Sequence, residues 1–110
     1  MQNYQIGSVV LLKLPFSDAV NFKLRPALLL LNTGDNDVVV ARITSQINQT
    51  AFDVEITEWQ EASLMRPSIV RLHKIATVEK NLLERQLGIL KPNDWHKVCQ
   101  SIHQLWSSIK

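Results

Sequence analysis

The sequence predicts a mainly β fold with short helices: a small, partly open antiparallel barrel followed by one C-terminal helix. Short runs rich in Val, Ile, Leu and Thr recur as far as residue 90, and turn-forming residues separate them. One longer segment near the C-terminus carries apolar residues at helical spacing. Several short strands followed by one helix are typical of a small curled sheet.

The first two strands are predicted at residues 8–14 and 27–31. The first run is continuously apolar, so we expect it to be covered on both faces. Residues 16–24 contain Ser, Asp and Asn, which favour a loop. Pro26 lacks an amide hydrogen and is expected only where a strand opens or lies at an edge. Residues 32–36 are rich in turn formers and predict a hairpin.

Residues 37–45 are predicted to form the central strand, because β-branched side chains fit a pleated surface. Alternation places four residues on one face: Val38, Val40, Arg42 and Thr44. That face begins apolar and ends polar, as a strand does when it runs from a core into a site. The alternative is that Arg42 and Thr44 only mark the solvated end of the strand.

Three later strands complete the predicted sheet. Residues 52–57 alternate between apolar and polar and indicate a half-exposed strand. Residues 68–75 form the next strand, with Arg71 and His73 on one face. Residues 86–90 return as a brief strand.

Helical signals occur in three places. Thr57 is placed to cap one helical turn over residues 57–62, and residues 77–84 have the start of a short helix. The one long helix is predicted over residues 94–109. Its apolar stripe indicates packing in a core or a dimer rather than a cofactor site; the stripe comprises Trp95, Val98, Cys99, Ile102, Leu105, Trp106 and Ile109.

Composition places the chain among globular proteins, with residues 1–110 expected as one domain. Of its 110 residues 45% are hydrophobic and 20% charged, enough to bury a single core. No signal peptide or membrane-spanning run is recognisable, and the lone Cys99 cannot form an internal disulfide, so we expect cytoplasmic residence. No cluster has metal-ligand spacing, and we expect neither a metal nor a cofactor. The net charge of +2 is compatible with a polyanionic ligand without requiring one.

Five polar residues at strand ends could meet at one rim of the barrel: Arg25, Thr44, Ser45, Arg71 and His73. Cleavage of RNA by its own 2′-hydroxyl needs a base, an acid and cations around the phosphorane, and it needs no metal. An imidazole titrates near neutrality and can act as either base or acid. Guanidinium groups match phosphate oxygens, and hydroxyls can hydrogen-bond developing charge.

Each of these residues also has a plainer interpretation. Arg71 is equally consistent with a cross-strand pair to Asp53 or Glu55, and His73 with an ordinary surface position. His96 and His103 have no metal-binding spacing and are taken as surface residues. The two aromatic residues of the first loop, Phe16 and Phe22, would either stack on bases or close one end of the barrel.

Five strings in order resemble the MazF/PemK family of toxin ribonucleases. They are GSVVLL at residues 7–12, LPFSD at 14–18, RPAL at 25–28, VARITSQ at 40–46 and PSIVRLHKIAT at 67–77. The resemblance implies an SH3-like, CcdB/MazF-like barrel and a homodimer. It also implies metal-independent cleavage of single-stranded RNA within short sequences, to 2′,3′-cyclic phosphate and 5′-hydroxyl ends. A cognate antitoxin, whose disordered segment covers the RNA groove, would neutralise the toxin.

Carried over residue by residue, the resemblance assigns catalytic roles to Arg25 and Thr44. In the plasmid-borne branch an Arg and an Asp two residues apart serve as acid and base, and those positions match Arg71 and His73. The imidazole here replaces a carboxylate, so either His73 keeps the proton-transfer role or Arg25 and Thr44 form the central pair. Further RNA contacts are predicted at Phe16, Lys23, Arg42, Ser45, Gln46 and Lys74.

Two other functions stay open at this point. The gyrase-inhibiting toxins are similar in fold and act through apolar residues at the end of the last helix, where this chain has Trp106. The chain would then be a binding poison of DNA gyrase rather than an enzyme. A catalytically inactive relative kept for protein contacts is the third possibility.

Overall fold

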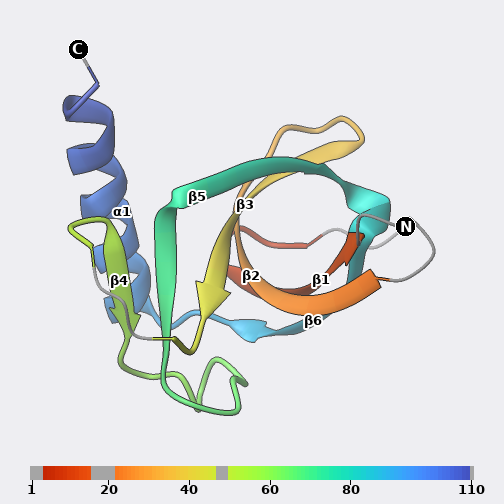
Figure 1. The fold of residues 1–110 in the computed structure, drawn as a ribbon, viewed down its shortest axis with the longest axis horizontal. Helices are drawn as coiled ribbons and strands as arrows, with labels where there is room; N and C mark the ends of the chain where they lie inside the picture. The colour runs from red at the N-terminus through yellow and green to blue at the C-terminus, as the bar shows by residue number, and fades with distance from the viewer. Residues whose placement is uncertain (1–3, 16–21, 47–49, 110) are drawn as a thin grey trace.

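A six-stranded antiparallel sheet curls into a partly open barrel, and one helix lies against its outside (Figure 1). The computed structural model describes residues 4–15, 22–46 and 50–109. The strands are β1 (Ser8–Pro15), β2 (Phe22–Asn32), β3 (Asp37–Thr44), β4 (Asp53–Ile56), β5 (Ser68–Glu79) and β6 (Leu83–Ile89). Their spatial order is β4-β5-β3-β2-β1-β6, so β3 and β2 are central and the sheet does not close. The predicted fold class is confirmed.

Strands β1, β2 and β3 contribute buried residues on both faces of the sheet. For β1 this is what its continuously apolar sequence predicts. One face fills the barrel interior with residues such as Val10, Leu29 and Val40. The opposite face, which includes Val9 and Leu28, packs toward β4, β5 and the helix. Burial of two faces is why these strands carry apolar side chains at successive positions rather than at alternate ones.

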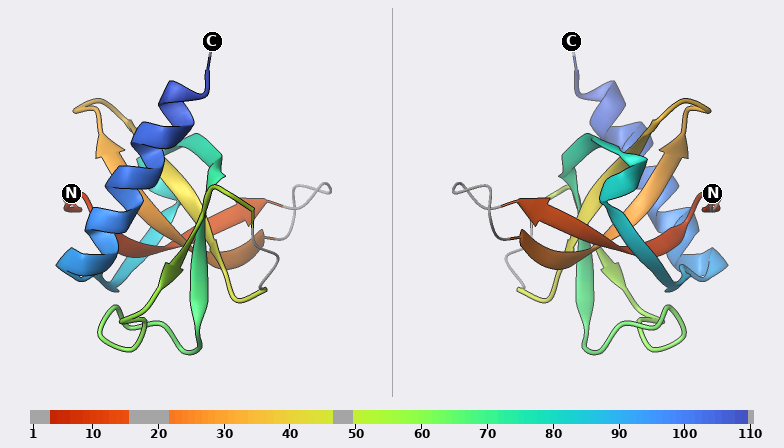
Figure 2. Two further views of the ribbon diagram at one scale, coloured as in Figure 1. Left: turned by 90° about the vertical axis from the view of Figure 1, so that its left-hand side faces the viewer. Right: turned by 90° about the vertical axis from the view of Figure 1, so that its right-hand side faces the viewer.

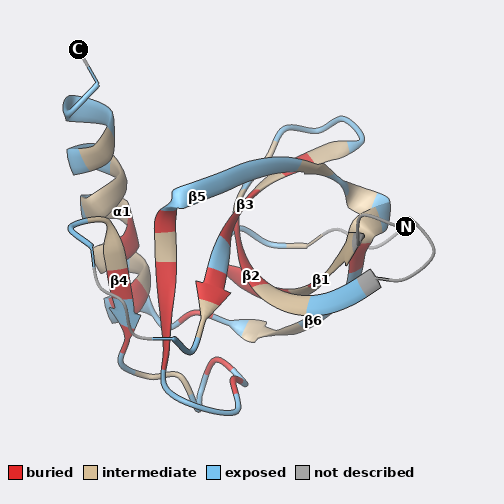
Figure 3. Ribbon diagram, viewed as in Figure 1, coloured by how far each residue is buried: buried red, intermediate tan, exposed pale blue. Residues whose placement is uncertain are grey.

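β5 is one long strand with a corner. Its pairing with β3 jumps from Ala41–Ile75 to Arg42–Arg71, so residues 72–74 have no partner on β3. The segment before the corner is largely buried, whereas the segment after it is largely exposed (Figure 3). The corner lets β5 complete the barrel with one arm and pair with β4 through the other.

The helix α1 (Pro92–Ser107) begins two residues before the predicted start and ends two residues before the predicted end. Val98 is fully buried against the sheet, whereas Trp106 and Ile109, at the other end of the predicted stripe, are 74% and 65% exposed. The C-terminal end of α1 extends past the sheet (Figure 2), so only the first part of the stripe is core. None of the helices in the described ranges has the length and apolarity needed to cross a bilayer.

Three predicted boundaries were wrong. β2 begins at Phe22 and passes through Pro26, which is tolerated because β3 pairs with β2 only from Ala27 onward and Pro26 has a neighbour on the β1 side alone. β5 continues to Glu79, and only a 3₁₀ turn, Lys80–Leu82, stands where a short helix is expected over 77–84. β6 consequently begins at Leu83.

Residues 57–62 form turns and no helix. Thr57 does not cap them; its hydroxyl donates to Asp94 in the first turn of α1, over 2.8 Å. The turn ends at Ser63, whose φ of 66° is unusual for a residue with a side chain. Cap-forming residues also favour turns, so the local sequence alone does not separate the two outcomes.

Asp94 fixes this turn to the helix, and we call Asp94, Thr57, Glu58 and Lys97 the Asp94 joint. The buried carboxylate accepts hydrogen bonds from the Thr57 amide and hydroxyl and from the Glu58 amide, and it pairs with the Lys97 ammonium at 3.1 Å. Burial alone would raise the pKa of Asp94, but these four donors together lower the pKa below its ordinary value.

The far end of the turn is fixed by a close approach to β6. A Cβ built on Gly88 would lie 2.5 Å from the carbonyl oxygen of Ala62, so no larger residue fits there without moving the backbone. The turn is thus held at both ends, by α1 and by β6, and residues 63–66 are carried to the end of β3.

Candidate active site

A cavity of about 580 Å³ lies where β3 ends. Arg25 and Pro26 of β2 line it on one side, and the residues from Arg42 to Gln46 follow β3 along it. Residues 63–66 of the turn held by Asp94 and Gly88 line it as well. The remaining lining residues are Leu11, Ser68 and Leu87. The cavity therefore joins segments that are far apart in the sequence.

Arg25 and Arg42 also line a second cavity of about 280 Å³. Its other lining residues include interior side chains of the barrel, such as Val40, and Lys74 from the corner of β5. The register explains why the two arginines approach each other: Ala27, two residues after Arg25, pairs with Arg42. We call Arg25, Arg42, Thr44, Gln46 and Arg66 the cationic rim.

The cations of the rim lack acidic partners. Among the residues that the structure describes, no carboxylate lies within ion-pair distance of Arg25, Arg42 or Arg66. Arg25 donates to a backbone carbonyl, that of Leu24, at 3.2 Å. Three guanidinium groups without counter-charges have the charge and the donor geometry that suit anions, and phosphate in particular.

Thr44 is half-buried at the end of β3, and its side chain is already oriented. Its hydroxyl oxygen accepts a hydrogen bond from the Gln46 amide over 3.1 Å. A hydroxyl that uses its oxygen as the acceptor keeps its proton for donation to a ligand. Ser45 and Gln46 are exposed beside it in the same cavity.

The structure brings Arg25, Thr44 and Ser45 together, as the rim hypothesis expects, and it places Arg42 and Gln46 beside them, but it does not bring Arg71 and His73 into the same cavity. These two line neither cavity. They lie against Asp53 of β4 instead, with 3.4 Å from Arg71 Nε to Asp53 Oδ1 and 3.8 Å from His73 Nδ1 to the same oxygen. The alternative interpretation of Arg71 as a cross-strand partner of Asp53 is the one found, since the two residues are in register.

The other predicted RNA contacts are distributed unevenly. Lys74 lines the second cavity beside the two arginines. Lys23 is exposed on β2, two residues before Arg25. Phe16, and the side chain of Phe22, lie outside the described residues.

Sequence reasoning missed the turn residues of the cavity, above all Met65 and Arg66. Met65 is 93% exposed, which is unusual for so apolar a residue. The only sign of these turn residues in the sequence is that an apolar and a basic residue, Met65 and Arg66, stand directly before Pro67 and between two strands. Nothing in that local pattern says that the turn meets the end of β3.

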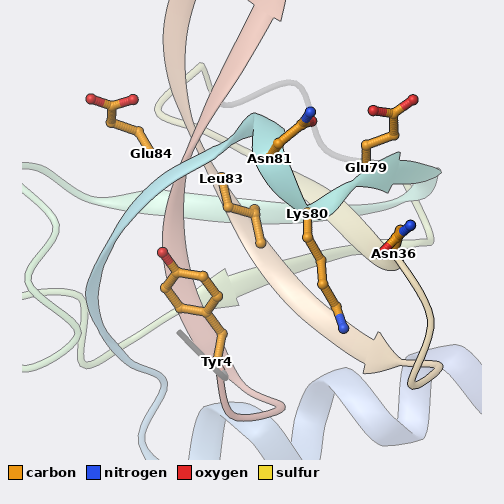
Figure 4. Close-up of a pocket in the computed structure, with 7 residues that line it drawn as sticks. All are labelled: Tyr4, Asn36, Glu79, Lys80, Asn81, Leu83 and Glu84. Atoms are coloured by element: carbon orange, nitrogen blue, oxygen red, sulfur yellow. The ribbon is translucent and has the colours of Figure 1, made fainter. Parts of the chain in front are cut away.

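A third cavity, of about 510 Å³, lies under the 3₁₀ turn and does not have the same character (Figure 4). It is at the opposite end of β3, because Glu79 pairs with Asp37. Lys80 extends downward from the 3₁₀ turn and Tyr4 extends upward from below it, whereas Glu79, Asn81 and Glu84 extend upward from the turn and away from Lys80. Glu84 forms an ion pair with Lys13 at 3.1 Å. Its polar groups diverge, so the cavity at the end of β3 is the better candidate.

Comparison with known families gives one match over nearly the whole chain. Residues 5–106 match the family described as PemK-like, MazF-like toxin of type II toxin-antitoxin system. A comparison with curated proteins gave no match.

Several solved structures share the fold. A Mycobacterium tuberculosis toxin, MazF-mt6, is 24% identical, with a TM-score of 0.72 over 91% of this chain and 96% of its own. An endoribonuclease in complex with its cognate antitoxin, from a mycobacterial species, is 19% identical, with a TM-score of 0.76 over 98% and 99%. A MazE-MazF structure from Deinococcus radiodurans is 16% identical, with a TM-score of 0.80 over the same shares. At these identities the likeness establishes the fold.

Proposed function

Because this chain belongs to the PemK-like, MazF-like toxin family of type II toxin-antitoxin systems, we propose that it is an endoribonuclease that cleaves single-stranded RNA. The observation that carries the proposal is the cationic rim. Its arginines have no counter-charge in the described chain, and they stand beside a hydroxyl oriented to donate. Similar folds bear the name endoribonuclease, which supports the same activity here.

Binding begins with the phosphates. Arg25 and Arg42 border both cavities, Arg66 lines one and Lys74 lines the other, so cations follow a path across the end of the barrel. Such a path suits several successive phosphates of one strand. Lys23, Ser45, Gln46 and Phe16 are the further contacts that we propose along it.

The cavity also suits unpaired bases. Its apolar lining, which includes Leu11, Leu64 and Leu87, offers a surface on which a base turned out of a strand can pack. Met65 presents a flexible thioether at its edge. Bases within a duplex are stacked and paired and do not reach such a surface, so we propose single-stranded RNA as the substrate.

The proposed reaction is an internal transesterification. The ribose 2′-oxygen forms a bond to phosphorus, and the bond from phosphorus to the 5′-oxygen breaks. The 2′-hydroxyl proton passes to a base and the departing 5′-oxygen receives a proton from an acid, leaving 2′,3′-cyclic phosphate and 5′-hydroxyl ends. No metal takes part in these bond changes, which is the basis for proposing a metal-independent enzyme.

Two residues of the rim, Arg25 and Thr44, have separate tasks in this reaction, and the two proton-transfer residues lie on the neighbouring strand. The Arg25 guanidinium neutralises the additional charge on the phosphorane oxygens. The Thr44 hydroxyl donates to one of these oxygens while the Gln46 amide holds it in place. His73 and Arg71 are the proposed proton-transfer pair, one strand away from Arg42.

The proposed partner is a cognate antitoxin. Similar folds are named in complex with an antitoxin or as MazE-MazF. An acidic, extended segment would satisfy the unpaired arginines of the rim and exclude RNA at the same time. We further propose a homodimer of one-domain subunits acting in the cytoplasm.

The test is cleavage of a long single-stranded RNA by the purified protein in excess EDTA. We expect cuts at a small set of sequences, with cyclic phosphate and 5′-hydroxyl ends, and no cuts when the complementary strand is annealed. Lys80→Ala is the matched control, since Lys80 is a cation at the opposite end of β3. Intact RNA under these conditions would refute the ribonuclease.

One observation favours a second candidate. Trp106 is largely exposed on the end of α1 that extends past the sheet. The chain would use this region to bind and inhibit DNA gyrase if it were a non-enzymatic toxin. Arrest of DNA supercoiling by gyrase, lost in Trp106→Ala and accompanied by intact RNA, would decide for that candidate.

A further inference from the structure

One buried carboxylate has no place in the site described above. The Asp53 side chain is 0% exposed. Its Oδ2 accepts a hydrogen bond from the Thr50 amide at 2.7 Å. Its Oδ1 is buried and makes no hydrogen bond within the described chain, and the same is true of the Arg71 Nε that faces it.

A buried carboxylate oxygen that accepts no hydrogen bond is costly and therefore needs a reason. Here Oδ1 faces two cationic or protonatable donors at once, Arg71 Nε at 3.4 Å and His73 Nδ1 at 3.8 Å. Both separations are within ion-pair range, and the second is longer than a hydrogen bond. The carboxylate is thus shared between the two side chains rather than committed to either.

We propose that Asp53 is a positioning residue that orients His73 and Arg71 for proton transfer at the cationic rim. The proposal rests on the ribonuclease function proposed above. Asp53 does not touch the substrate; it acts through the two side chains of β5.

The sheet register links Asp53 to the rim. Asp53 pairs with Arg71, and Arg71 pairs with Arg42, so the three residues form one row across β4, β5 and β3. Paired residues of an antiparallel sheet point to the same face, which is the face that Arg42 presents to both cavities. The row therefore ends in the rim.

His73 lies at the corner of β5, between two residues that border the rim. Arg71 precedes it and pairs with Arg42, and Lys74 follows it and lines the second cavity with Arg25. The corner leaves His73 without a partner on β3, so the strand ladder does not fix its side chain. A carboxylate on the neighbouring strand supplies that constraint.

The chemistry follows from which ring nitrogen faces the carboxylate. With Nδ1 toward Asp53, the neutral imidazole keeps its proton on Nδ1, and Nε2 is the nitrogen with a free lone pair. Nε2 then accepts the 2′-hydroxyl proton, and the carboxylate stabilises the imidazolium that results. Asp53 also offsets the like charges of Arg42 and Arg71, which stand side by side in the register.

The first test is kinetic. Asp53→Asn should lower kcat at least about tenfold with KM nearly unchanged, as loss of an orienting partner does. His73→Ala should lower kcat at least as much. Asp53→Asn should cost less in the His73→Ala background than it costs alone, because only its effect on Arg71 is then left. Glu55→Gln, which removes an exposed carboxylate two residues along β4, should leave kcat unchanged. Independent losses that multiply in the double variant would overturn the proposal.

The second test does not depend on cleavage. Ring ¹⁵N shifts of His73, recorded above the pH at which imidazole titrates, report which nitrogen carries the proton. We expect the Nδ1-protonated form in the wild-type protein and a shift toward the Nε2-protonated form in Asp53→Asn, or in Asp53→Ser if the first variant unfolds. The Nε2-protonated form already dominant in the wild type would overturn the positioning role, whether or not the protein cleaves RNA. Absence of cleavage with the Nδ1 form present would refute only the ribonuclease.

Discussion

The cationic rim and the Asp94 joint both concentrate charge at the ends of secondary structure elements, and they use it in opposite ways. At the joint, both carboxylate oxygens of Asp94 are occupied by donors from Thr57 and Glu58, and Lys97 balances the charge. At the rim, Arg25, Arg42 and Arg66 face the cavity without a carboxylate partner in the described chain.

The difference separates groups that hold the fold from groups that are free to bind. A buried charge whose partners are all within the protein has nothing left for a ligand, and removing it leaves those partners buried without an acceptor, which destabilises the fold. Exposed like charges without partners contribute nothing to stability and attract an anion. Substitutions at the rim should therefore change activity at constant stability, and substitutions at the joint should do the reverse.

Arg25→Ala should give the largest effect. Loss of the guanidinium from the phosphorane is expected to lower kcat/KM for RNA by about a thousandfold. The melting temperature should stay within about one degree, because within the described ranges the Arg25 side chain donates to a backbone carbonyl and to no carboxylate. Rates on a long single-stranded RNA and a thermal melt check both parts. A fall in activity that parallels a fall in melting temperature would contradict the claim that rim residues act on RNA and not on stability.

Asp94→Ala should have the largest effect on stability. It leaves two backbone amides and a lysine without their acceptor in a buried position, and we expect a loss of about 3 kcal/mol in the free energy of unfolding. Urea unfolding measures this loss. At a temperature where the variant is folded, kcat should stay within severalfold of the wild type. Glu61→Ala, an exposed carboxylate in the same turn, is the control.

Thr44→Val keeps the shape of the side chain and removes the donor. We expect kcat to fall about a hundredfold, with little change in the melting temperature. Thr44→Ser should retain most of the activity, because it keeps the hydroxyl that the Gln46 amide orients. If Val and Ser were equally active at this position, Thr44 would be only the solvated end of β3.

Arg42→Ala should affect binding more than chemistry. We expect RNA affinity to fall about tenfold, and the slope of log affinity against log salt to become shallower by about one unit. Binding titrations at several salt concentrations measure both. The same slope in variant and wild type would remove Arg42 from the phosphate path.

The smallest of these expected effects is a dependence of stability on pH that comes from the Asp94 joint. The pKa of Asp94 is lowered in the folded protein, so its contribution is complete at pH values above the ordinary pKa of an aspartate. That contribution is lost as the pH falls through the lowered pKa. Stability from this group should therefore be flat from pH 7 to about 5 and decline below about 4. In Asp94→Asn the acid-dependent part of the stability curve should be reduced.

Local patterns in the sequence predicted the scaffold and the position of one part of the candidate site. The β-branched run at residues 37–45 predicted a central strand, and the alternation of its side chains between two faces put Thr44 at the polar end of one face. The structure has Thr44 there. Turn formers at 32–36 predicted the hairpin, which Gly34 closes with a φ of +86°. Both are decided within about ten residues, where side-chain periodicity and turn chemistry are strong signals.

The remaining features depend on contacts between distant segments. Asp94 is a helix-start residue by pattern, and nothing local says that its carboxylate holds Thr57 37 residues away. The turn at 63–66 reaches the cavity because Gly88 on β6 allows a close approach to Ala62. Arg71 is directed to Asp53 by strand pairing across β4 and β5, which alternation alone does not specify.

The most direct test of the cationic rim is to locate bound RNA on the folded protein. Once a cut site is mapped, an oligonucleotide with a 2′-deoxy residue at that position binds without being cleaved, and NMR can follow its titration. We expect shifts concentrated on Arg25, Arg42 and residues 44–46, with the Asp94 joint and the cavity around Lys80 unchanged. Shifts confined to the C-terminal end of α1, around Trp106, with an unchanged rim would contradict the account.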